Sequence, residues 1–342
     1  MTKEKPLYRQ TLREALTIIW RNKFLWFFGL FAAMAGSVEY NFLIEGFSRS
    51  SGDKPLTLGF LDVVQDVANT GIFRFETLGN LKRIMIENPF SFFMSVFIFL
   101  VFLGIAAFVI WLIVVSQASL ISATRKIEQG EVADLREEIE KNRRSFWPLF
   151  ILNFINKFLT GLLLVLVGVV VFVSAIKATV MTLLLFILVF VVFISLSLII
   201  AFITKYAICF VVLKKQGWFE SIKSAVNLFF ANWVISLEMA LILFAIDFVF
   251  VLFFAISTLV LMLAVAMLMI LAAFLSLKMT FWGVVILPVI LLIILFLIIT
   301  SGLTAFQYSS WTLLFMRLAG KKTVVSKLAR LASNLSNKVM GS

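Results

Sequence analysis

Residues 180–213 read VMTLLLFILVFVVFISLSLIIAFITKYAICFVVL and contain a single charged side chain, Lys205. A helix needs about 20 apolar residues to cross about 30 Å of hydrocarbon, so this stretch is long enough to span a membrane. A helix also satisfies its own backbone hydrogen bonds, which is what lipid requires of a spanning segment. The stretch lacks the alternation of apolar and polar residues that is typical of a strand in a membrane barrel. It therefore predicts a transmembrane helix.

Five further segments share this apolar character, and the whole chain is 62% hydrophobic and only 14% charged. They are residues 24–37, 90–124, 146–175, 233–276 and 281–315. We therefore predict an all-α, polytopic helical bundle of about six spans, forming a single membrane domain over residues 1–342. Eight spans are the alternative, in which the last two segments each cross twice. We favour six, with part of residues 257–279 lying in the interface or re-entering the membrane.

The distribution of Lys and Arg orients the spans, because short cytoplasmic loops are enriched in these residues. Residues 1–23, 125–144 and 317–342 carry six each, and residues 214–223 carry three. The connection 38–89 carries five against seven acidic residues. We therefore expect a bacterial cytoplasmic (inner) membrane protein with both termini on the cytoplasmic side and an extracytoplasmic connection over residues 38–89.

A short polar motif recurs ahead of three of the apolar segments. The tripeptide LRE at 12–14 returns at 135–137, and at the same offset Asn22 falls on Ser145. A third copy, IKSAVNLFFAN at 222–232, keeps the spacing between alanine and asparagine found in the first copy. Each copy predicts a polar or amphipathic helix that ends in a small polar residue just before a span.

The segments that return to the cytoplasmic side also end alike. They are SQASLISATRKIEQG (116–130), TKYAICFVVLKKQG (204–217) and FQYSSWTLLFMRLAG (306–320). Each has a long polar side chain deep in the span, namely Gln117, Lys205 or Gln307, followed by basic residues and a glycine. Glycine and cations both suit the C-terminus of a helix.

These similarities predict three repeats of the same orientation, each an interfacial helix followed by a helical hairpin. The repeat units are 12–130, 135–217 and 222–320. The alternative is that cytoplasmic span ends resemble one another because the same membrane acts on each. Repeats of one orientation differ from the inverted repeats of many alternating-access transporters.

The segments LREALTIIWRNKFLWFFGL (12–30), SIKSAVNLFFANWVISL (221–237) and FQYSSWTLLFMRLAG (306–320) resemble a bacterial group of membrane domains. The group comprises the membrane domain attached to some glycerophosphoryl diester phosphodiesterases and related uncharacterised six-span families. The resemblance covers most of residues 12–320 and implies an inner-membrane helical bundle. In some members this bundle is fused to a hydrolase of lipid head groups, but no catalytic residue can be carried over to this sequence.

Polar side chains at membrane depth are candidates for function, because burying them in hydrocarbon is costly. They are Gln117, Asn153, Asn156, Lys157, Lys205, Glu238, Asp247 and Gln307. Asp247 is expected to pair with Lys157 or with Lys205, since isolated charges are expensive in lipid. The residues then form either a structural ion pair between helices or a polar cavity that holds a lipid head group or an ion.

Two further features concern flexibility and the end of the chain. Pro288 should kink the last long segment, and Gly302 is a second soft point, so the two form either a static kink or a hinge. Residues 321–342 place apolar residues at helical spacing among basic ones, which is typical of an amphipathic helix on an anionic leaflet.

The sequence contains no histidine, which excludes His-ligated metal sites and Ser-His or Cys-His catalytic pairs. We expect no enzymatic activity, no cofactor and no metal. The net charge of +12 would suggest nucleic acid in a soluble chain, but here the basic residues lie at the ends of predicted spans, so we expect no nucleic-acid partner. The favoured function is to organise or handle lipids or small amphiphiles through a polar intramembrane cavity. The alternatives are a channel or transporter that uses Lys157, Lys205 and Asp247, and an accessory or scaffold subunit of a larger membrane complex.

Overall fold

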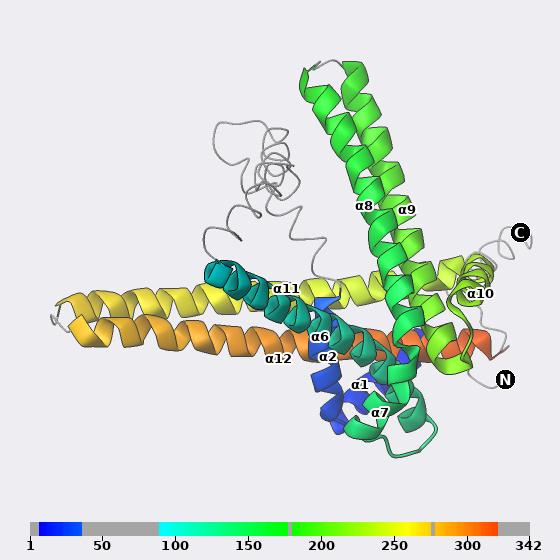
Figure 1. Ribbon diagram of the computed structural model, residues 1–342, viewed down its shortest axis with the longest axis horizontal. Helices are drawn as coiled ribbons and strands as arrows, with labels where there is room; N and C mark the ends of the chain where they lie inside the picture. Colours follow the sequence, from blue (N-terminus) through cyan, green and yellow to red (C-terminus); the bar gives the residue numbers. More distant parts are fainter. Residues whose placement is uncertain (1–6, 36–88, 177–179, 275–277, 321–342) are drawn as a thin grey trace, which may run out of the picture. The chain divides into compact units, whose positions relative to one another are not determined.

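The computed structural model describes residues 7–35, 89–176, 180–274 and 278–320, and within these ranges it contains helices and short turns but no strand (Figure 1). The helices are α1 (Leu7–Arg21), α2 (Phe24–Met34), α6 (Pro89–Glu128), α7 (Leu135–Asn142), the 3₁₀ turn η1 (Arg143–Ser145), α8 (Phe146–Ile176), α9 (Val180–Lys214), α10 (Trp218–Ala231), α11 (Trp233–Phe274) and α12 (Lys278–Ala319). The predicted connection 38–89, apart from residue 89, and the predicted amphipathic tail 321–342 lie outside the described residues.

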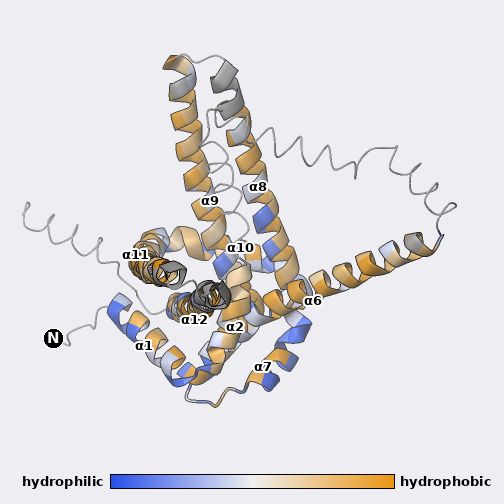
Figure 2. Cartoon of the chain, turned by 90° about the vertical axis from the view of Figure 1, so that its left-hand side faces the viewer, coloured by the Kyte–Doolittle hydropathy of each residue, from blue (hydrophilic) through white to orange (hydrophobic). Residues whose placement is uncertain are grey.

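Five of these helices are long and apolar enough to cross a membrane: α6, α8, α9, α11 and α12. Their apolar character runs along most of their length, whereas α7 is largely polar (Figure 2). The shorter helix α2 is apolar and occupies the start of the first predicted span, 24–37. The chain is therefore a multi-pass helical membrane protein. The exact number of crossings stays a prediction.

The helices α11 and α12 are much longer than a bilayer requires. Each has 42 residues, which corresponds to about 63 Å at 1.5 Å per residue. We expected part of residues 257–279 to lie in the interface or to re-enter the membrane, and residues 257–274 of this range continue α11 without a break. They therefore contain no turn of the kind that re-entry would need.

The order of the described helices repeats along the chain as one short helix followed by two apolar helices. It reads α1-α2-α6, then α7-α8-α9 with η1 after α7, then α10-α11-α12. A side-chain hydrogen bond marks the end of each short helix. Asn22, Asn142 and Asn232 each donate from Nδ2 to the carbonyl oxygen four residues earlier, at 2.8, 2.8 and 3.1 Å. This bond gives a carbonyl oxygen in the last turn of each short helix a side-chain donor.

The structure corrects the predicted equivalence of Asn22 and Ser145. The residue that plays the role of Asn22 in the second copy is Asn142, because α7 has 8 residues and α1 has 15. Ser145 instead ends the 3₁₀ turn η1, which carries the chain from α7 into α8. Aligning the two motifs at one fixed sequence offset gave the wrong counterpart of Asn22, because α7 is shorter than α1.

The predicted role of the terminal glycines is confirmed at one position and wrong at another. Gly130 follows α6 in the left-handed conformation, with φ of 83°, as expected for a helix C-terminus. After α9, however, Lys215 takes the left-handed conformation, with φ of 56°. Gly217 is extended, with φ of −64°, and precedes α10 as its N-cap.

The described chain divides into two compact units, and the long helices contribute to both. Among the described residues, the first unit contains 7–33, 115–149, 205–274 and 278–320, and the second contains 34–35, 89–114, 150–176 and 180–204. In the second unit, α8 and α9 run side by side (Figures 1 and 2). The first unit holds most of the buried side chains, which come from the C-terminal ends of α6, α9 and α12 together with the short helices.

Small and hydroxyl-bearing residues let the helices of the first unit approach closely, as is common between membrane helices. Gly29 of α2 lies directly against the backbone of α12. A Cβ added at Gly29 would overlap the carbonyl oxygen of Ser301 and come within 3.1 Å of the Ala305 Cβ. The hydroxyl of Ser301 also donates to the Trp26 carbonyl oxygen of α2.

The substitution Gly29→Ala is expected to separate α2 from α12, because the added methyl group would overlap backbone atoms that cannot rotate away. Overpacking of this kind costs about 1–3 kcal/mol. Gly302→Ala is the matched control, since its Cβ would meet only the ring of Trp26 at 3.6 Å. Thermal unfolding of the purified protein in detergent should show a lower midpoint for Gly29→Ala than for Gly302→Ala. Equal midpoints would contradict the close approach.

Candidate functional site

The three deep polar side chains predicted at the ends of the repeats all contribute to the first unit. Gln307 donates from Nε2 to Asp247 Oδ2 at 2.6 Å. Lys205 lies over the ring of Trp311, with Nζ 4.8 Å from the ring centroid, and also interacts electrostatically with Asp247. Gln117, which is only 1% exposed, hydrogen-bonds through its side chain to Tyr308. The helices α6, α9 and α12 thus bring these residues into one polar cluster.

A small cavity of about 20 Å³ opens within this polar cluster. Its lining residues are Ile121, Lys205, Ile208, Cys209, Gln307, Tyr308, Trp311 and Thr312. A water molecule needs about 10–15 Å³ by this measure and two to four polar partners. The cavity therefore has room for a water molecule and is far too small for a phospholipid head group.

The remaining predicted polar residues lie elsewhere. Asn153, Asn156 and Lys157 are half-buried on α8 and belong to the second unit. There Asn156 Oδ1 accepts a hydrogen bond from the Thr204 hydroxyl at 3.4 Å. Because Lys157 and Asp247 belong to different units, their pairing stays a prediction. Lys205 is the basic residue that the structure brings to Asp247.

Glu238 and the two candidate hinge residues have structural surroundings of their own. Glu238 on α11 accepts a hydrogen bond from the Tyr8 hydroxyl, which ties the short helix α1 to α11. The helix α12 continues through Pro288. Gly302 faces the ring of Trp26 on α2. A hinge role for Pro288 and Gly302 stays a prediction.

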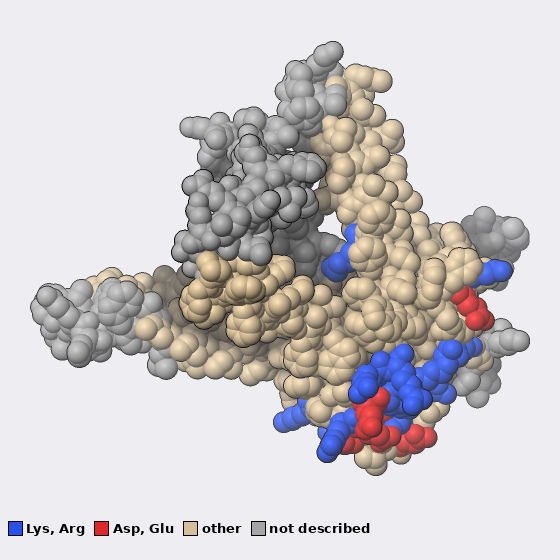
Figure 3. Space-filling view, in the orientation of Figure 1, with Lys and Arg blue, Asp and Glu red and all other residues tan. Residues whose placement is uncertain are grey.

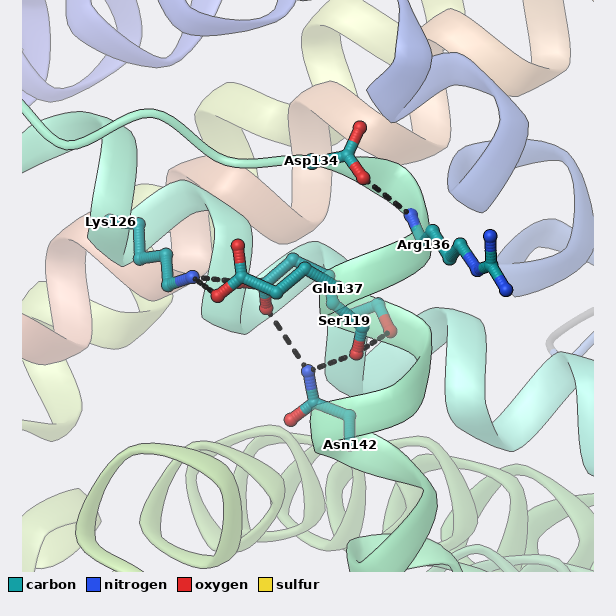
Figure 4. Close-up of polar contacts among 7 residues, drawn as sticks. Ser119, Lys126, Asp134, Arg136, Glu137 and Asn142 are labelled. Carbon is teal, nitrogen blue, oxygen red and sulfur yellow. Dashed lines mark hydrogen bonds and ion pairs between the residues drawn. The ribbon is translucent and has the colours of Figure 1, made fainter.

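The sequence interpretation missed a buried carboxylate at the centre of the short helix α7. Glu138 is completely buried, and its Oε1 lies 2.9 Å from Lys126 Nζ of α6. Figure 4 shows the polar side chains of this region, among them Lys126, Glu137 and Asn142. Its Oε2 accepts from Asn142 Nδ2 at 3.2 Å, and its carbonyl oxygen accepts from the Ser119 hydroxyl at 3.1 Å. Lys126 also pairs with the exposed Glu137 at 2.6 Å. These contacts fasten α7 to the end of α6.

A similar ion pair fastens α1 to the end of α12. Arg317 Nη2 pairs with the carboxylate of Glu14, and Arg317 Nη1 donates to the Thr11 hydroxyl at 2.6 Å. Glu14 and Glu137 are the glutamates of the two LRE tripeptides. Each therefore binds a basic residue near the end of a long helix from another predicted repeat. The recurring LRE motif was the signal in the sequence from which this role could have been recognised.

Basic side chains gather on the surface around α7 (Figure 3). Lys215, just after α9, has a pKa that burial lowers most, and the nearby cations Lys141 and Arg125 lower it further. Glu138 opposes this shift. Arg125 is held beside α9 because its Nη1 donates to the Leu213 carbonyl oxygen at 2.9 Å. This surface therefore carries an excess of positive charge.

The described residues contain no group of three or more His, Cys, Asp or Glu side chains that could hold a metal ion. Comparisons with protein-family models, with curated proteins and with solved structures gave no match. The resemblance to the membrane domain of glycerophosphoryl diester phosphodiesterases therefore stays a hypothesis drawn from the sequence.

Glu138→Gln should destabilise the protein, because the partly exposed Lys126 and the buried amide donor of Asn142 would face a side chain that no longer carries charge. Removing the charge of a completely buried carboxylate from its ion pair and its amide donor is expected to cost about 2–3 kcal/mol. The control Glu137→Gln removes the same charge from the same lysine at a side chain that is 59% exposed, where about 1 kcal/mol or less is expected. Denaturant titration in mixed micelles measures both values. Equal losses would contradict a structural role for Glu138.

Proposed function

We propose that the protein is a non-enzymatic membrane protein that organises or handles anionic lipids of a bacterial inner membrane. In this proposal the short helices α1, α7 and α10 lie in the cytoplasmic interface and their basic residues contact lipid head groups. The observation that carries the proposal is the combination of exposed tryptophans and clustered cations at the junctions between short and long helices.

Exposed tryptophans stand at all three junctions. The exposed fraction is 65% for Trp20, 67% for Trp147 and 55% for Trp233. Each tryptophan lies within five residues of the asparagine that ends the short helix, which we call the junction asparagine (Asn22, Asn142 or Asn232). Tryptophan favours the level of the lipid head groups, because its ring is amphipathic. Each Lys or Arg near an anionic membrane surface contributes about 1 kcal/mol of attraction. Both features favour an interfacial position for this end of the first unit.

The three predicted repeats are part of this proposal. They are supported by the recurring order of short and long helices and by the asparagine that ends each short helix. Because the cavity among Lys205, Gln307 and Trp311 has room for one water molecule, we assign lipid contact to the basic interface rather than to the interior.

The protein purified directly from its own membranes should retain phospholipid, with anionic head groups enriched above their share of the bulk membrane. Native mass spectrometry gives the mass increments, and lipid extraction of the same membranes gives the reference composition. A retained lipid profile equal to that of the bulk membrane would overturn the anionic-lipid proposal. A mass increment that matches another protein would instead support the accessory or scaffold alternative.

The channel or transporter alternative rests on a separate observation. The Oδ1 atom of Asp247 is buried and has no hydrogen-bond partner within the described part of the chain, although Lys205 and Gln307 are close by. A site of this kind is typical of ion and proton pathways.

If the protein conducts ions, vesicles containing it should show a proton or cation flux above that of empty vesicles. Asp247→Asn should then abolish this flux, because the substitution removes the charge at the unpaired oxygen. The control is Glu137→Gln, which removes an exposed carboxylate far from the predicted membrane depth. Flux absent from the wild-type protein, or unchanged in Asp247→Asn, would contradict this alternative.

A further inference from the structure

We call the place where a short helix meets the end of a long helix a joint. Two of the short helices are fastened at their joint by the same kind of ion pair. In the first joint, Arg317 of α12 binds Glu14 of α1. In the second joint, Lys126 of α6 binds Glu137 of α7. The third joint is the corresponding place at the end of α9, where residues 215–217 lead directly into α10.

The third joint keeps the basic residue. Lys126 lies nine positions after Gln117 and Lys214 lies nine after Lys205, by direct subtraction of the residue numbers. A second cation, Lys215, follows immediately. Lys214 is exposed, and its Nζ lies 5.7 Å from the ring centroid of Phe210 on its own helix.

The third joint lacks the glutamate. Ala15 of α1 and Ala225 of α10 are both completely buried, and each lies seven residues before its junction asparagine. The same alternation of buried, intermediate and exposed residues runs over 11–15 and over 221–225. In this alignment Ser224 takes the place of Glu14.

The hydroxyl that Arg317 contacts in the first joint also has a counterpart in the third joint. Thr11, which receives a hydrogen bond from Arg317, corresponds to Ser221 in the same alignment. The side chain of Ser221 is completely buried, and its Oγ has no hydrogen-bond partner among the residues that the structure describes. A buried hydroxyl without a partner is costly, so its presence calls for an explanation.

The acidic residues near the third joint are already engaged. Glu138, which faces Lys215, forms an ion pair with Lys126. Glu220 at the start of α10 accepts a hydrogen bond from Gln216 at 3.4 Å. The cations Arg125 and Lys141 add to the positive charge around Lys215.

We infer that the third joint binds one phosphate group of an anionic lipid, which replaces the missing glutamate between the end of α9 and α10. Lys214 and Lys215 supply the charge, and Ser221 and Ser224 supply hydroxyl donors. Phosphate oxygens accept charge-assisted hydrogen bonds from ammonium groups and hydroxyls, so the chemistry fits. Phe219 at the start of α10 is 71% exposed, which favours a lipid over free phosphate because it offers an apolar contact for acyl chains. This inference rests on the proposed lipid function and names its binding site.

The test replaces the missing carboxylate within the chain. Ser224→Glu should occupy the third joint with its own anion, pair with Lys214 or Lys215 and exclude the lipid phosphate. Ser224→Gln is the matched control, because it has nearly the same size and no charge.

The full-length protein would be titrated in detergent with phosphatidylglycerol, with phosphatidylcholine and with inorganic phosphate. Native mass spectrometry follows the two lipids, and the thermal unfolding midpoint follows phosphate. We expect Ser224→Glu to weaken phosphatidylglycerol binding about tenfold or more, the value of one charge-assisted hydrogen bond. Ser224→Gln should weaken it less, because its amide group can still donate to a phosphate oxygen and adds no negative charge, and Ser224→Glu should itself raise the unfolding midpoint at low salt.

The possible results of this titration distinguish a failure of the proposed binding site from a failure of the proposed lipid function. Phosphatidylglycerol binding that is equal in the wild type and in Ser224→Glu would overturn the site and leave the lipid proposal standing. A phosphate effect abolished by Ser224→Glu, without any preference for phosphatidylglycerol over phosphatidylcholine, would support the site and contradict the lipid as its source. If Ser224→Gln loses as much phosphatidylglycerol binding as Ser224→Glu, the negative charge of the introduced glutamate is not what excludes the lipid phosphate. This result would overturn the inference.

Discussion

The close packing of three helix ends is the constraint on which the first unit depends. Lipid removes the hydrophobic driving force between spanning helices, so short contacts between small and hydroxyl-bearing side chains must hold them together. Thr124 of α6 and Ser309 of α12 share a hydrogen bond at 2.9 Å, and Tyr206 of α9 bonds Ser236 of α11 at 2.7 Å. These contacts bring together the deep polar cluster and, at the helix ends, the cations that the short helices bind.

Gathering three helix C-termini with their basic residues has an electrostatic consequence. Each cation is favoured by the dipole of its own helix, but the cations repel one another where the ends meet. Glu14 and Glu137 offset this repulsion at two of the three ends, and each also fastens a short helix. The contact between α1 and α12 joins the first predicted repeat to the last, so the same ion pairs that neutralise charge also close the unit.

How much of this could be read from the sequence depends on how local each signal is. The long helices and the depth of Lys205 and Gln307 follow from apolar runs, and the structure places helices there. The pairing of Glu14 with Arg317 joins residues 303 positions apart, and no local pattern states which element lies beside which. The burial of Glu138 could not be predicted for the same reason, because a run of charged residues is expected to be exposed to solvent unless a neighbouring helix covers it.

The differences among the three joints carry more information about function than their similarities do. If the three joints arose from one ancestral arrangement, the helix ends impose the same electrostatic requirement on each, and an internal glutamate meets it twice. At the third joint the cations remain while Ser221 and Ser224 offer only hydroxyls. A chain that needed only a rigid scaffold would gain stability from a third glutamate, because the ion pair would form without recruiting a ligand. The third joint instead lies beside the exposed side chains of Trp218 and Phe219, and in the proposed function the missing anion comes from the membrane itself.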